Sequence, residues 1–134
     1  MLKTYKGSCH CGAIQYEADI DLSQGTGRCN CTFCLKARAW GTFVKPESFR
    51  LDPASDPGVP YYKHTEAPVK YHCARCGVRT HATGNADYKG GPIVCVFFAT
   101  LDDASPEELL SGPIRYSDGL HNDWTHAPAE TRHL

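Results

Sequence analysis

The chain has 134 residues, of which 41% are hydrophobic and 22% are charged, and its formal net charge is −1. This composition is typical of a globular domain with one modest core and argues against a disordered chain. A charge so close to zero gives no indication of nucleic-acid binding or of an anionic membrane surface, because both need a basic face. The first residues are polar and lead into cysteines without an apolar signal core, and no later stretch is long enough to span a bilayer. We therefore expect a cytoplasmic protein with no nucleic-acid or membrane partner.

Short β-strands are expected along most of the chain. Ala13–Ala18 alternates, with apolar side chains on one face, which is the pattern of a half-buried strand. Further segments are rich in β-branched and aromatic residues, and these are Trp40–Val44, Tyr61–His64, Val69–His72 and Ile93–Ala99. Glycine and proline clusters, around residues 52–60 and 84–92, separate these segments. The sequence therefore predicts a small, mainly β domain.

Helical structure is expected at two places only. Cys31–Ala37 is predicted to form a short helical turn. Ser105–Leu110 has a serine in the N-cap position, a proline at the first helical position and a glutamate three residues after the cap. This is a capping box, and Gly112 and Pro113 end the helix. The tail after Trp124 shows no periodicity and is expected to be irregular.

Eight cysteines in a chain of this size need a chemical explanation. The even count permits a disulfide framework, but there is no secretion signal, and reducing compartments keep thiols free. Cysteines one residue apart on an extended strand also point to opposite sides, which does not suit a disulfide. Seven of the eight lie in tight clusters, which are Cys9 and Cys11, Cys29, Cys31 and Cys34, and Cys73 and Cys76. Tetrahedral zinc needs sulfurs about 2.3 Å from a common centre, and such short loops supply them. We therefore predict two zinc ions bound through seven thiolates.

The spacing of the clusters predicts how the cysteines divide. Two pairs make four ligands and close a structural zinc site, formed by Cys9, Cys11, Cys73 and Cys76. A glycine follows each pair, Gly12 and Gly77, and lets the chain turn sharply beneath the metal. Bound zinc would also contribute to the folding free energy of a chain with so many turns.

The remaining triplet, Cys29, Cys31 and Cys34, is the more informative set. Three protein ligands leave a fourth position for water or substrate, which indicates a catalytic zinc. A fourth protein ligand would close the site, and the alternatives are Cys95, His10, His72 and His81. The cysteine lies in an apolar run and is more typical of a small buried hydrophobe, while a histidine in a strand is usually satisfied by hydrogen bonds or solvent.

The charge of the triplet limits its chemistry. Zinc with three thiolates has a formal charge of −1, so it is a weak Lewis acid. Such a centre remains suited to a soft ligand, above all an incoming thiolate. The expected small-molecule partner is therefore a thiol or a thiol adduct.

Five segments of the sequence resemble one known family in the same order. Gly7–Gly12, Cys29–Cys34 and Cys73–Gly77 are similar to its three cysteine motifs. Leu101–Asp103 and Asp118–Trp124 are also similar to segments of this family. On these motifs the chain resembles the glutathione-dependent formaldehyde-activating enzyme family, which includes centromere protein V.

The resemblance implies a fold, two metals and a reaction. The implied fold is a zinc-ribbon-like β-tent, with residues 1–134 forming one domain whose tail from about residue 125 is irregular. The implied structural zinc is bound by Cys9, Cys11, Cys73 and Cys76, and the implied catalytic zinc by Cys29, Cys31 and Cys34. The implied activity is that of a carbon–sulfur lyase, the reversible joining of formaldehyde to the thiol of glutathione, as in an S-(hydroxymethyl)glutathione synthase.

Other polar and aromatic side chains are weaker candidates for the site. His121, Asp123 and Arg38 are candidates for handling the proton of the adduct, although each is more typical of an exposed surface side chain. The aromatic candidates for lining a pocket, which are more typical of a core, are Trp40, Trp124 and Tyr88.

Two alternative functions remain open. In the first, both zincs are structural and the chain is a non-catalytic interaction module, with a local basic patch from Arg28, Lys36, Arg38 and Lys45. In the second, the zinc thiolates serve in redox chemistry or metal storage. The fourth ligand of the triplet zinc distinguishes the enzyme from the module, because an exchangeable ligand favours the enzyme.

Overall fold

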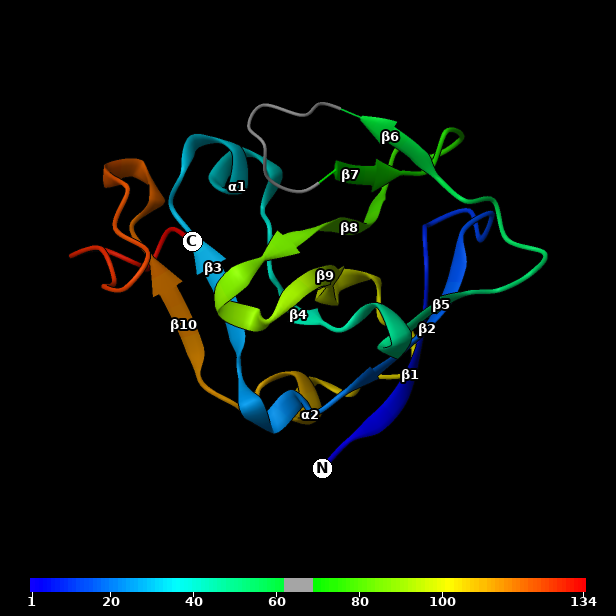
Figure 1. Ribbon diagram of the computed structural model, residues 1–134, viewed down its shortest axis with the longest axis horizontal. Helices are drawn as coiled ribbons and strands as arrows, with labels where there is room; N and C mark the ends of the chain where they lie inside the picture. Colours follow the sequence, from blue (N-terminus) through cyan, green and yellow to red (C-terminus); the bar gives the residue numbers. More distant parts are fainter. Residues whose placement is uncertain (62–68) are drawn as a thin grey trace.

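The computed structural model describes residues 1–61 and 69–134, and its strands form two sheets (Figure 1). The smaller sheet has the order β1-β2-β5, and the larger has the order β10-β3-β4-β9-β8-β7-β6. Most neighbouring strands are antiparallel, whereas β10 and β3 are parallel. The strands are β1 Lys3–Ser8, β2 Gln15–Ile20, β3 Thr26–Cys29, β4 Gly41–Val44, β5 Phe49–Leu51, β6 Val59–Tyr61, β7 Val69–His72, β8 Arg79–Ala86, β9 Gly91–Phe97 and β10 Ile114–Ser117.

Helical structure within the described residues is short. The α-helices are α1 Thr32–Ala37 and α2 Pro106–Leu109, and the 3-10 turns are η1 Leu22–Gln24, η2 Pro46–Ser48, η3 Asp87–Lys89, η4 Phe98–Thr100 and η5 Gly119–His121. The mainly β prediction is confirmed. No helix in the described part of the chain is long and apolar enough to cross a membrane.

The main core lies between the two sheets. Ile14, Tyr16 and Ala18 are 0%, 2% and 0% exposed, so the predicted alternation before and along β2 is confirmed. The side chains of β2 pack with Val94 and Val96 of β9. Since side chains alternate along a strand, the intervening Cys95 projects from the opposite face of the large sheet. That outer face carries α1 and the candidate site.

The predicted strand segments correspond closely to β4, β7 and β9. Residues 62–64 of the predicted strand Tyr61–His64 lie outside the described residues, and β6 ends at Tyr61. Both predicted separators overlap strands, because β8 continues through Gly84–Ala86 and pairs there with the start of β9, and β6 already begins at Val59. The segment remains in the strand because Gly84, Asn85 and Ala86 pair with Ile93, Pro92 and Gly91 of β9.

The predicted capping box of α2 is confirmed. Ser105 Oγ accepts a hydrogen bond from the backbone N–H of Glu108 at 3.2 Å, and Glu108 Oε2 accepts one from the N–H of Ser105 at 2.9 Å. Glu108 Oε1 also accepts from Lys3 Nζ at 2.7 Å and so ties α2 to β1.

The segment after Trp124 has no helix or strand, and it returns to α1 (Figure 1). The His126 carbonyl accepts from the backbone N–H of Asp118 at 3.2 Å. The His133 carbonyl accepts from the Arg38 guanidinium at 2.8 Å. These two bonds fix the path of the chain past the edge formed by α1 and β3.

Candidate metal centres

The first group of sulfurs joins two turns that are far apart in the sequence. The Sγ atoms of Cys9, Cys11, Cys73 and Cys76 all lie within 4.8 Å of one another. The Cys9–Cys11 and Cys11–Cys73 sulfur separations are 3.7 and 3.6 Å. Four sulfurs at about 2.3 Å from a tetrahedral zinc are about 3.8 Å apart, so this group fits a zinc ion.

Both turns of this four-cysteine centre are built alike. Gly12 and Gly77 have φ values of +78° and +77°, which favour glycine, so the predicted turns are confirmed. Their backbone N–H groups donate to the carbonyls of Cys9 and Cys73 at 3.1 and 2.9 Å. Cys9 and Cys73 are 3% and 1% exposed and pack with Ile14 in a second small core.

Backbone N–H groups point at the sulfurs of this centre. Cys9 Sγ accepts from Ile14 N at 3.3 Å, and Cys73 Sγ accepts from Arg75 N at 3.3 Å and from Cys76 N at 3.4 Å. Hydrogen bonds from the Val78 and Cys11 backbones lower the pKa of Cys76 to about 6. These donors favour thiolates, which are the forms that bind zinc.

The second group consists of Cys29, Cys31 and Cys34, whose sulfurs also lie within 4.8 Å of one another. Cys29 ends β3, Cys31 is the N-cap of α1, and Cys34 lies in its first turn. All three residues are partly exposed, in contrast to Cys9 and Cys73. Within the described residues no further cysteine, histidine or carboxylate belongs to this three-cysteine centre.

The start of α1 orients the three sulfurs. Cys31 Sγ accepts from the N–H of Cys34 at 3.3 Å, in the manner of a capping side chain, and Cys29 Sγ accepts from the N–H of Cys31 at 3.4 Å. Although burial works in the other direction, hydrogen bonds lower the pKa of Cys31. Burial raises the pKa values of Cys29 and Cys34. Arg38 ends the helix in the left-handed region at φ 52°.

A polar network links this centre to the loop after β10. Asn30 is 8% exposed, and its Nδ2 donates to Asp118 Oδ1 at 2.7 Å, while its Oδ1 accepts from Leu120 N at 3.0 Å. The Asp118 oxygens in turn lie 2.8 and 2.9 Å from His121 Nδ1. These bonds to Asn30 and His121 lower the pKa of Asp118. The ring of His121 is therefore held through two side chains by the segment between Cys29 and Cys31.

Gly119 lies directly against the sulfur of Cys29. A Cβ at this position would be 2.6 Å from Cys29 Sγ and 2.8 Å from the ring of Trp124. No side chain fits there without displacing one of them. The resemblance of Asp118–Trp124 to a family segment pointed to this loop, but nothing in its spacing predicted the contact with Cys29.

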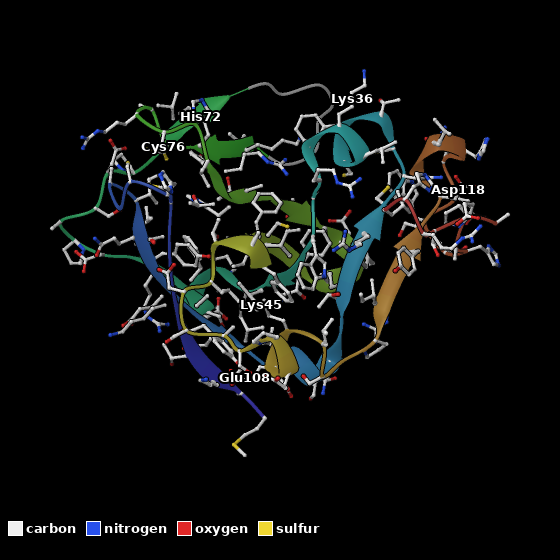
Figure 2. The ribbon with its side chains drawn as sticks, turned by 180° about the vertical axis from the view of Figure 1, so that it is seen from behind. Lys36, Lys45, His72, Cys76, Glu108 and Asp118 are labelled. Atoms are coloured by element: carbon white, nitrogen blue, oxygen red, sulfur yellow. The ribbon has the colours of Figure 1, made fainter. Side chains whose placement is uncertain are left out.

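A small hollow lies beside the three-cysteine centre. It is lined by Arg28, Cys29, Cys34, Leu35, Arg38, Ala39 and Leu134. Arg28 stacks over the ring of Trp40 at 4.9 Å. Of the residues of the predicted basic patch, Lys36 lies at the top of the view in Figure 2 and Lys45 near its middle, where Lys45 Nζ donates to the Lys89 carbonyl at 2.8 Å.

None of the candidates for a fourth ligand joins the three-cysteine cluster within the described residues, although Cys95 is close enough to Cys34 to raise its pKa. His72 Nδ1 lies 2.8 Å from the carbonyl oxygen of Cys73. His81 is buried, with Nδ1 2.9 Å from Thr80 Oγ1, and His10 is exposed beside the other centre. Burial raises the pKa of Cys95 to about 12, and this thiol lies outside the cluster of three.

The remaining candidates differ in their surroundings. Asp123 accepts from Thr125 and His126 within its own loop, and Arg38 is bound to the His133 carbonyl. Trp40 packs against Phe98 of the core at 5.6 Å between ring centroids, whereas Tyr88 and Trp124 are 79% and 62% exposed. His121 is linked to the three-cysteine centre through Asp118 and Asn30, and Arg38 lines the hollow beside it.

Comparison with known proteins gives a family match that spans both centres. The model of a family described as glutathione-dependent formaldehyde-activating enzyme matches residues 4–112, which contain all seven cysteines of the centres. The chain belongs to this family. Its membership connects it with glutathione- and formaldehyde-related chemistry, and the resemblance seen in the sequence is confirmed.

A solved structure supports the fold. The chain is similar to a crystal structure of a Rhodobacter sphaeroides protein, with a TM-score of 0.63 and 25% sequence identity. The similarity covers 82% of this chain and 99% of the other. Part of the present chain therefore has no counterpart in that structure, and the family match likewise stops at residue 112, before β10 and the loop that holds His121.

Proposed function

We propose that this chain is a zinc-dependent carbon–sulfur lyase-like enzyme, which joins and separates a thiol and a carbonyl compound at the three-cysteine centre. Glutathione and formaldehyde are the proposed pair, as in an S-(hydroxymethyl)glutathione synthase. The observation that carries the proposal is the contrast in ligand number: four sulfurs in one centre and three partly exposed sulfurs in the other. The cytoplasmic location stays a prediction.

The two proposed zinc ions have different tasks. Cys9, Cys11, Cys73 and Cys76 would hold a structural ion, and Cys29, Cys31 and Cys34 would hold a catalytic one. When bound at three sulfurs, zinc supplies an open position that stabilises the substrate sulfur as thiolate.

In the lyase direction, the carbon–sulfur bond of the hydroxymethyl adduct breaks and its electron pair stays on sulfur. The hydroxyl group of the adduct loses its proton and becomes the carbonyl oxygen of formaldehyde. His121 is the proposed acceptor of this proton. Its Nδ1 is bonded to Asp118, so the other ring nitrogen, Nε2, is the atom that would accept the proton. Asn30 is the proposed positioning residue, because it holds Asp118.

The test is the rate of formaldehyde release from S-(hydroxymethyl)glutathione above the spontaneous rate. We expect acceleration by the zinc-loaded protein, its loss in Cys31→Ser, and a reduction of about 100-fold in His121→Gln. His126→Gln is the matched control, since His126 has a similar bond to Asp123 in the same loop. Zinc-loaded, folded protein that neither accelerates release nor binds any thiol would contradict the proposal and favour the structural interaction module.

A further inference from the structure

A β-bulge directs one arginine toward the outer face of the large sheet. In the β7–β8 pair, Tyr71 is opposite His81 and His72 is opposite Arg79, so Thr80 is an extra residue on β8. His81 faces the core, where its ring stacks on Tyr71 with centroids 4.7 Å apart. Regular alternation would place Arg79 on that same core face, but the extra residue reverses it.

The contacts of Arg79 confirm this direction. Its guanidinium lies 4.3 Å from the ring centroid of Phe97 and 5.4 Å from that of Phe33. Its Nη2 also donates to the Ala37 carbonyl at the end of α1, at 3.2 Å. Arg79 is therefore tied to the helix that carries Cys34.

A lysine on the neighbouring strand reaches the same place. Lys70 pairs with Ala82 on the outer face, is 7% exposed, and holds its Nζ 4.5 Å from the centroid of Phe33. Burial lowers the pKa of Lys70, whereas the thiols of Cys34, Cys31 and Cys95 act in the opposite direction, so these sulfurs lie within electrostatic range of its ammonium group. Phe33 adjoins Cys34 in α1, so two cations flank the aromatic ring next to a ligand sulfur.

The charge of the centre explains why cations are useful there. With zinc bound, the three thiolates would give the centre a formal charge of −1, and a substrate thiolate would change this charge to −2. A centre that is partly withdrawn from water tolerates the additional charge only with opposite charges nearby. Asp118 is an acid beside this centre, and it is already bonded to Asn30 and His121.

We propose that Arg79 and Lys70 are specificity-determining residues, which balance the second negative charge of the three-cysteine centre when a substrate thiol binds there as a thiolate. The thiol releases its proton to solvent as it binds. A neutral oxygen ligand such as water adds no charge and gains nothing from the two cations. The pair therefore selects thiols over water and alcohols. This inference rests on the proposed function.

The test uses the cobalt-substituted protein and the uncharged thiol 2-mercaptoethanol, so that only the sulfur contributes charge. Binding is followed by the sulfur-to-cobalt charge-transfer absorption, and the cobalt content of each variant is measured. We expect Arg79→Gln and Lys70→Gln each to raise the dissociation constant about ten-fold or more. Arg79→Lys keeps the charge and should change it by less than about three-fold. Lys36→Gln, an exposed cation on α1, is the matched control and should leave it unchanged.

Several outcomes would overturn the proposal. One is equal thiol affinity in the glutamine variants and in Lys36→Gln. Another is an equal loss in Arg79→Lys and Arg79→Gln, which would assign the effect to the shape of the guanidinium. A third outcome is loss of cobalt from both glutamine variants with retention in Arg79→Lys. It would show that the positive charges are needed to bind the metal, and not to bind the thiol. A wild-type spectrum that no thiol changes would instead contradict the proposed function.

Discussion

The two cysteine centres use the same ligand atom and differ in number, burial and neighbours. The four-cysteine centre joins two glycine turns and packs within a small core, where Cys9 and Cys73 are almost fully buried. The three-cysteine centre lies at the start of a surface helix beside cations and a His–Asp pair. On the proposed function, the same type of ligand would serve stability where four cysteines close the centre, and chemistry where three leave it open.

The largest expected effect comes from removing a ligand of each centre in turn. Cys73→Ser should release the structural zinc and lower the free energy of unfolding by several kcal/mol, about 5 or more, because the metal stabilises the folded state. Cys31→Ser should leave most of that stability intact while abolishing thiol binding. Denaturant unfolding and zinc content measure both. Equal destabilisation by the two variants would remove the distinction between the centres.

Metal removal gives the next contrast. Three partly exposed thiolates should release zinc to a chelator before four closed ones, because the open position allows the chelator to enter. We expect one zinc per chain to leave first, with the fold retained, as followed by metal release and circular dichroism. Simultaneous loss of both ions with global unfolding would contradict this prediction.

The third prediction concerns Gly119. Gly119→Ala places a methyl group against Cys29 Sγ and should weaken metal binding at the three-cysteine centre, with a loss of about 1 to 3 kcal/mol in stability. Gly27→Ala is the matched control on β3, because its new Cβ would meet nothing closer than 3.8 Å. Unchanged zinc affinity in Gly119→Ala would show that the loop around residue 119 shifts to make room for the methyl group and that Cys29 Sγ does not move.

Acid stability should depend on a histidine between the two sheets. Burial lowers the pKa of His81 to about 4 from its ordinary value of 6.5. Between these values the unfolded chain binds more protons than the folded one, so this contribution is complete above pH 6.5 and is lost as the pH falls toward 4. The loss should reach about 2 to 3 kcal/mol. His81→Gln should be less sensitive to acid over this range, as measured by denaturant unfolding of samples whose zinc content is also followed. If the unfolding free energy of His81→Gln falls with pH as steeply as that of the wild type, the acid sensitivity belongs to the thiolates instead.

The smallest effect is expected at α2, away from both centres. Ser105→Ala removes the capping oxygen and should cost about 1 kcal/mol in unfolding free energy. Zinc content and thiol binding should stay as in the wild type. A change in either would mean that α2 is coupled to a metal centre.

Some of this structure could be predicted from the sequence because the signals are local. The capping box of Ser105 and Glu108, the glycine turns after each cysteine pair and the alternation of Ile14, Tyr16 and Ala18 each depend on a few adjacent residues. Cysteine spacing grouped the sulfurs correctly, since a zinc site imposes short loops.

The rest depends on contacts between distant segments. β3 and β10 carry little pattern of their own and become strands because they pair with each other in parallel. The bulge at Thr80, which turns Arg79 toward α1, arises from a register shift that no periodicity predicts. No residue near Asn30 in the sequence indicates its contact with Asp118, which lies 88 residues away.

The most direct test of the account is cadmium-113 NMR of protein in which cadmium replaces both zinc ions, recorded before and after addition of glutathione. Two resonances are predicted at the start, because one metal has four sulfur ligands and the other has three. Glutathione should move only the three-sulfur resonance, toward the position of the four-sulfur one. Two resonances that glutathione leaves unmoved would contradict an open, thiol-binding centre.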